Sequence, residues 1–164
     1  MKKLFIVSAL VVSAIALRAD ETSSAFQASL TPNIAVHPKT TEIRGFAINI
    51  WGENPQHAFN FGIVNGSTGQ SSGFSWAFVN YDDSYTGVQW GMVNYSKENF
   101  KGWQSGMVNY SKGNVRGFQN GIVNYAENLH GVQMGLINIA ANNDWFKGMP
   151  DKFAKGFPLF NWSF

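Results

Sequence analysis

The chain of 164 residues contains no cysteine, and this absence excludes several kinds of chemistry. Without thiols there are no disulfides, no thiolate nucleophile and no Cys-ligated metal site. A cysteine-dependent acyltransferase or polyester synthase is excluded for the same reason. The folded chain must therefore be held together by side-chain packing and strand pairing.

Charge is also scarce, since only 13% of the residues are Asp, Glu, Lys or Arg. Lys2 and Lys3 precede an uncharged, mostly apolar run over residues 4–17, which predicts a secretory signal peptide over residues 1–19. There is no second run long enough for a transmembrane helix. Without Lys2, Lys3 and Arg18, nine basic residues remain against ten acidic ones. An exported chain this close to neutrality lacks the electrostatic drive for nucleic-acid binding.

A repeat of fourteen to fifteen residues dominates what is present. Four consecutive copies read GVQWGMVN (87–94), GWQSGMVN (102–109), GFQNGIVN (117–124) and GVQMGLIN (131–138). Related segments begin at residues 45, 58 and 73, so the repeats cover about 45–139 of a single β domain over 20–164. A fixed period indicates one small unit that is copied and stacked. The repeat-defining residues are expected to be structural: Gly87, Gln89, Gly91, Asn94, Gly102, Gln104, Gly106, Asn109, Gly117, Gln119, Gly121, Asn124, Gly131, Gln133, Gly135 and Asn138.

Side chains alternate in size and polarity through each repeat, which predicts one long strand per repeat and an all-β fold of about eight to nine strands. Over residues 100–110, one predicted face carries Lys101, Trp103, Ser105, Met107 and Asn109. The other carries Phe100, Gly102, Gln104, Gly106, Val108 and Tyr110. Polar segments such as Ser111–Asn114 then supply the turns.

Two architectures fit this pattern. The first is a small antiparallel barrel of the outer-membrane type, with bulky side chains outward and Gln, Gly and Val inward. The alternative is a β-solenoid with coils of 14–15 residues, in which identical Gln and Asn residues stack into ladders. The end of the chain favours the barrel, because Phe160, Trp162 and Phe164 form a terminal-strand signal within an expected strand over residues 156–164.

The repeat GxQxGxVN, the segment FQASLTP (26–32) and the ending NWSF (161–164) resemble a family of bacterial envelope surface-repeat proteins. The resemblance covers nearly all of the chain after residue 19. It implies a signal peptide and a location in the outer membrane or at the cell surface. It implies no catalytic activity.

Motifs for catalysis and metal binding are weak. Residues 69–73 (GQSSG) match the nucleophile-elbow pattern around Ser71, but the predicted context is a turn between strands and no helix follows. His130 shares its repeat position with Thr86, Lys101 and Arg116, so it is interpreted as a variable rim residue. Asp82-Asp83 could give half of a calcium site, yet no other repeat copies the pair. We therefore expect no enzyme and no catalytic, cofactor-binding or metal-binding residues.

The working prediction is a non-catalytic, exported envelope or surface repeat protein with a structural or interaction role. It associates with the outer membrane or envelope and has a possible protein or polymer partner. The alternative is a soluble periplasmic or secreted solenoid that binds a polymer or a protein. Non-repeat segments at 35–41 and 141–155, with Trp145 and Phe146, are expected to cap the stack or to offer a working surface.

Overall fold

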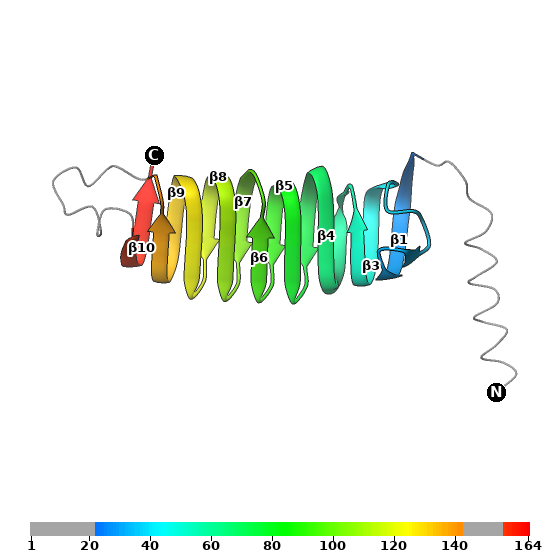
Figure 1. Ribbon diagram of the computed structural model, residues 1–164, viewed down its shortest axis with the longest axis horizontal. Helices are drawn as coiled ribbons and strands as arrows, with labels where there is room; N and C mark the ends of the chain where they lie inside the picture. Colours follow the sequence, from blue (N-terminus) through cyan, green and yellow to red (C-terminus); the bar gives the residue numbers. More distant parts are fainter. Residues whose placement is uncertain (1–21, 143–155) are drawn as a thin grey trace, which may run out of the picture.

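The computed structural model describes residues 22–142 and 156–164, which form an all-β solenoid of about seven turns (Figure 1). Each turn uses about fifteen residues, which is the alternative predicted from the repeat. In the described part of the chain, no helix is long and apolar enough to cross a membrane. The predicted signal peptide lies outside the described residues, as do Trp145 and Phe146.

Ten strands in the described ranges build one sheet that winds around the solenoid axis. Their bounds are β1 Ser23–Thr31, β2 Ile34–Ala35, β3 Glu42–Asn54, β4 His57–Trp76, β5 Val79–Trp90, β6 Val93–Ser96, β7 Phe100–Ser105, β8 Val108–Asn120, β9 Val123–Ala140 and β10 Gly156–Ser163.

Neighbouring coils pair in parallel, and equivalent repeat residues face one another. Gln104 on β7 pairs with Gln119 on β8, and Asn109 on β8 pairs with Asn124 on β9. The antiparallel barrel is therefore wrong. Its strands would have returned in alternating directions, whereas here the chain completes a full turn before it meets the preceding copy. Among the described strands, antiparallel pairing occurs only at the two ends, between β1 and β2 and between β9 and β10.

Each coil also bends where the sequence suggested a continuous strand. β7 ends at Ser105 and β8 begins at Val108, so Gly106 and Met107 form a corner. The corner reverses the alternation of side chains. Gln104 and Asn109 both point inward and are fully buried, whereas the sequence pattern put them on opposite faces of one strand. The predicted face assignment of Val108, Asn109 and Tyr110 is thus wrong.

The interior is unusual because side-chain amides fill most of it. Nε2 of Gln104, Gln119 and Gln133 each donates to Oε1 of the glutamine one coil earlier, at 2.8–2.9 Å. A second ladder runs the other way: the Nδ2 atoms of Asn80, Asn94, Asn109 and Asn124 each donate to Oδ1 of the asparagine one coil later, at 2.8 Å. Buried amides are tolerated because these hydrogen bonds replace the lost water.

A smaller apolar cluster fills the remaining part of the interior. Tyr85, Phe100, Val115 and Leu129 occupy equivalent positions in successive coils and are at most 4% exposed. The rings of Tyr85 and Phe100 stack with an interplanar angle of 3°. This cluster lies against the turns, and the amide ladders lie toward the corner.

The C-terminal strand closes the stack. β10 runs antiparallel to β9, and Nδ2 of Asn161 donates to Oε1 of Gln133 at 3.0 Å, which completes the glutamine ladder. Pro158 sits where the register shifts, and Leu159 has a φ of 71°. Of the predicted terminal-strand signal, Phe160 and Trp162 lie in β10 and Phe164 follows it.

Glycine is required where adjacent coils approach each other most closely. Gly117 has a φ of +139°, and a Cβ at this position would overlap the carbonyl oxygen of Gly102 in the preceding coil. Gly69 also has a positive φ, +62°, but a Cβ there would meet open space. Both glycines have a positive φ, but of the two only Gly117 lies against a neighbouring coil.

We expect Gly117→Ala to destabilise the fold by roughly 3 kcal/mol or more, because the coils must separate to admit the methyl group. Gly69→Ala should cost only about 1 kcal/mol, since an alanine can adopt its conformation. Urea unfolding of both variants measures the difference. Equal losses of stability would contradict the close coil contact.

Candidate functional surfaces

The repeat-defining residues predicted from the sequence lie in the interior of the solenoid and at the contacts between coils. Their glutamines and asparagines are at most 1% exposed. The structure brings them together in the axial ladders, and the glycines line the coil contacts and corners. Any contact with another molecule must therefore use the side chains that point outward, which differ from coil to coil.

Asp82 places a carboxyl group at the end of the glutamine ladder, which otherwise consists of amides. It occupies the position of Ser96 and Ser111 in the following coils and is 3% exposed. Its Oδ2 accepts from Gln89 Nε2 at 2.6 Å and from Ser96 Oγ at 3.1 Å, while no hydrogen-bond partner is found for Oδ1. Burial raises the pKa of this carboxyl to about 7, despite the two hydrogen bonds that lower it. Asp82 thus ends the glutamine ladder as its last acceptor.

The side chains of Asp82 and Asp83, which the sequence places next to each other, do not point toward a common site. Asp82 points into the interior, whereas Asp83 points outward, where its Oδ1 lies 3.6 Å from Lys97 Nζ and its Oδ2 accepts from the backbone nitrogen of Gly69 at 2.9 Å. Among the residues that the structure describes, no group of three His, Cys, Asp or Glu side chains could hold a metal ion.

A broad apolar surface covers the first strand segment and the corner of every coil. We call it the apolar face. Its side chains occupy three axial columns and are largely exposed; Trp76 and Phe78 are 57% and 59% exposed. The columns contain Phe59, Phe74, Trp103 and Phe118; Phe61, Trp76, Trp90 and Met134; and Ile63, Phe78, Met92, Met107, Ile122 and Leu136.

Neighbouring aromatic rings of the apolar face pack edge to face or at intermediate tilts. Trp90 and Trp103 have centroids 5.4 Å apart and an interplanar angle of 82°, and Phe61 and Trp76 have an angle of 85°. An open groove of ≈ 620 Å³ runs between Phe61, Trp76, Trp90 and Met107. The rings therefore form a rough apolar surface and not a row of coplanar platforms.

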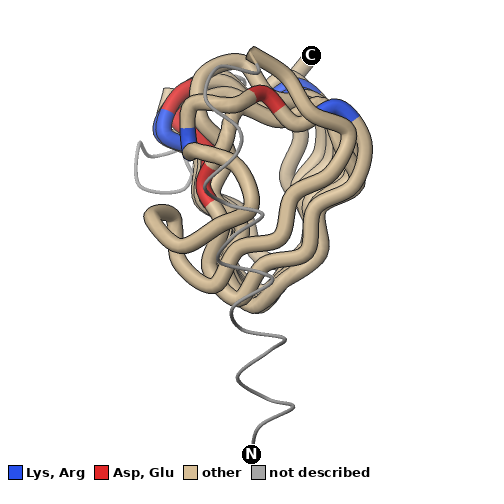
Figure 2. Tube along the Cα trace, turned by 90° about the vertical axis from the view of Figure 1, so that its right-hand side faces the viewer, with Lys and Arg blue, Asp and Glu red and all other residues tan. Residues whose placement is uncertain are grey.

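Charged residues avoid this surface. From Gly87 to Ser96, and in the matching segments of the other three clear repeats, there is no Lys, Arg, Asp or Glu. Viewed along the axis, the charges gather in the upper part of the coil and leave the remaining contour uncharged (Figure 2). The outer surface is thus divided into an apolar region and a charged region around the turns.

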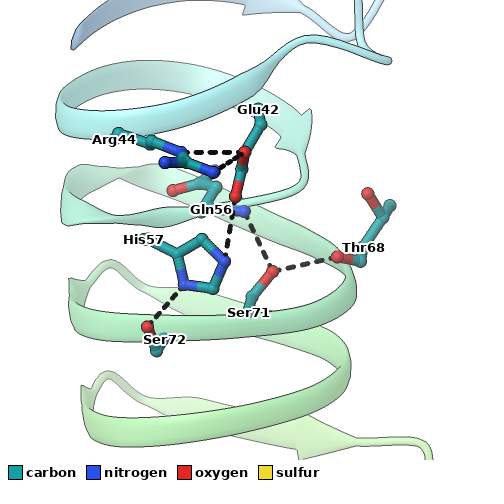
Figure 3. A network of polar contacts seen from close by, with 7 residues as sticks. All are labelled: Glu42, Arg44, Gln56, His57, Thr68, Ser71 and Ser72. Atoms are coloured by element: carbon teal, nitrogen blue, oxygen red, sulfur yellow. Dashed lines mark hydrogen bonds and ion pairs between the residues drawn. The ribbon is translucent and has the colours of Figure 1, made fainter. Parts of the chain in front are cut away.

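Glu42, His57 and Ser72, which come from successive coils, form a chain of polar contacts on the charged region (Figure 3). Nε2 of His57 lies 3.0 Å from Oε1 of Glu42, and its Nδ1 lies 2.7 Å from Oγ of Ser72. Arg44 holds the other oxygen of Glu42 through Nε and Nη2, at 2.9 and 2.8 Å. Sequence reasoning missed this cluster. The only signal for it is the coil period that separates His57 from Ser72.

The arrangement Glu–His–Ser has the composition of a hydrolytic triad, but its surroundings favour a structural role. Ser72 lies within β4, and its backbone N–H donates to the carbonyl oxygen of Gln56 at 2.7 Å. This N–H is therefore already used in strand pairing. An oxyanion needs N–H donors that are free to receive it. Ser71, the centre of the predicted elbow motif, is buried and bonded to Gln56 N and Thr68 O.

The stacked tyrosines and the other two histidines are spread over the molecule. Tyr95, Tyr110 and Tyr125 stack on the outer side of the second strand segment, at interplanar angles of 6° and 10°. His37 is buried beside Ser24, and His130 is exposed in the column of Lys101 and Arg116. These positions do not converge on one site.

Comparisons of the chain with family models, curated proteins and solved structures gave no match. The resemblance to envelope surface-repeat proteins therefore stays a prediction.

The buried carboxyl predicts an unusual dependence of stability on pH. The pKa of Asp82 is higher in the folded chain, at about 7, than the 3.8 of a free aspartate, so the folded state is destabilised as pH rises through this interval. Asp82→Asn should remove the effect and gain up to about 4 kcal/mol relative to the parent at pH 8, but little at pH 4. Urea unfolding at both pH values measures it.

The neighbouring substitution Asp83→Asn serves as the control, because it removes an exposed charge. It should leave most of the pH dependence in place. A gain from Asp82→Asn that is the same at pH 4 and pH 8 would show that the buried carboxyl is not the cause.

Proposed function

We propose that this protein is a non-catalytic, exported repeat protein of the bacterial envelope that lies on a membrane surface through its apolar face. The observation that carries the proposal is the exposure of large apolar side chains in every coil, although Ser105 and Asn120 interrupt the middle column between Trp90 and Met134. Soluble monomers rarely expose contiguous apolar patches of this extent unless the patch binds something.

A lipid surface matches the apolar face better than a neutral polysaccharide does. Sugar rings stack on flat aromatic platforms, but Trp90 and Trp103 turn edge to face and cover each other. A lipid interface accepts rings in any orientation, and Trp is favoured there. The absence of charge over the same contour removes the main cost of entering the interface.

Two sequence features support the location. The pattern of Lys2, Lys3 and the uncharged run at 4–17 is typical of export, and the repeat resembles that of envelope surface proteins. In this proposal the solenoid is a rigid scaffold, because its interior is set by the ladders and leaves only the outer surface to vary.

The proposal predicts binding of the protein to vesicles of phosphatidylcholine, with little effect of added salt because the contact is apolar. The double variant Trp76→Gln/Phe78→Gln should bind at least about tenfold more weakly, since each half-exposed aromatic contributes about 1–2 kcal/mol on burial. Cosedimentation with vesicles over a range of lipid concentrations measures the change.

Tyr110→Gln is the matched control, because it removes an aromatic side chain from the outer side of the second strand segment. It should leave vesicle binding within about twofold, while circular dichroism checks that all variants fold. Absence of vesicle binding by the parent protein would contradict the proposal. An equal loss of vesicle binding in the double variant and in Tyr110→Gln would contradict it as well.

A further inference from the structure

A row of basic side chains runs along the solenoid beside the apolar face. Parallel register places Lys101 next to Arg116, and Arg116 next to His130. All three are exposed. Thr86 and Ser72 continue the column toward the N-terminus. Since neighbouring strands are about 4.8 Å apart, like charges here face each other at close range, which destabilises the fold unless a counter-ion is supplied.

A row of amides lies parallel to the cations, on the other side of a groove of ≈ 440 Å³. Asn114 Nδ2 donates to Asn99 Oδ1 at 2.8 Å, and Gln70 lines the same groove. The buried rings of Tyr85 and Phe100 form its floor. The groove therefore offers donors, acceptors and positive charge along one axial line.

Lys101 and Arg116 form no ion pair with a described carboxylate, in contrast to Arg44, His57 and Lys97. Arg44 and His57 both contact Glu42 (Figure 3), and Lys97 pairs with Asp83. Within residues 22–142 and 156–164, no carboxylate lies within 4.0 Å of the charged atoms of Lys101 or Arg116. Lys101 and Arg116 are therefore adjacent positive charges that no described carboxylate neutralises at close range.

We propose that this groove binds a linear polysaccharide that carries carboxylate groups. Lys101 and Arg116 would pair with successive carboxylates, because the strand spacing is comparable with the length of one sugar unit in an extended chain. Asn99, Asn114 and Gln70 would hydrogen-bond sugar hydroxyls. The axial direction of the groove fits a linear polymer better than lipid headgroups, which spread over a plane.

The inference is independent of membrane docking, since it uses other residues and another kind of contact. Polygalacturonate, a linear polymer of carboxylate-bearing sugars, serves as the probe, and isothermal calorimetry at low salt measures binding. Lys101→Gln/Arg116→Gln should bind about tenfold more weakly than the parent. The control Lys97→Gln/Lys112→Gln removes the same charge away from the groove lining and should change affinity by less than about twofold.

Three outcomes would overturn the inference. The parent protein could fail to bind the polymer. Both double variants could lose affinity equally, which would mean that net charge alone is responsible. Binding could occur only to vesicles of anionic lipid and depend on Lys101 and Arg116, which would assign the row to headgroups. Vesicles of phosphatidylcholine, tested in parallel, report on the apolar face and not on this groove.

Discussion

Hydrogen bonding between buried side-chain amides is the constraint on which the rest of the structure depends. A buried glutamine needs an acceptor for its amide N–H, and Oε1 of Gln104 in the preceding coil supplies that acceptor to Nε2 of Gln119. The glutamine ladder donates toward the N-terminus and the asparagine ladder toward the C-terminus. Their amide dipoles therefore oppose each other, and the stack gains hydrogen bonds without building up a large axial dipole.

The sequence predicts most of this fold but does not determine whether neighbouring strands run parallel or antiparallel. The period gives the length of the coil, and the recurring Gln and Asn give its ladders. Strand direction is ambiguous because the motif GxQxG reads almost the same in both directions. The corner at Gly106 and Met107 is also not visible in the sequence. Met107 and Val108 are both apolar, so the reversal of alternation between them leaves no trace in a pattern of hydrophobicity.

The outward side chains are harder to predict, because the repeat does not constrain them. His57 and Ser72 could have been aligned by their fifteen-residue separation, but Glu42 reaches the same imidazole from a different position in its coil. Lys101, Arg116 and His130 share one repeat position, and the sequence analysis interpreted them as a variable rim. Only parallel pairing turns that rim into a row of adjacent basic side chains. Variability within a repeat thus hides a surface that is continuous in space.

Antiparallel strands of the same chain pair with the first and the last coil of the described solenoid. An open edge would expose unpaired backbone groups and invite another copy to stack on it. At the C-terminus, antiparallel β10 covers β9, and Asn161 satisfies the last glutamine acceptor. At the N-terminal end, antiparallel β2 pairs with β1. Strands of the same chain therefore pair with the outermost coils, and both proposed contacts lie on the lateral surface, where apolar and basic columns lie side by side.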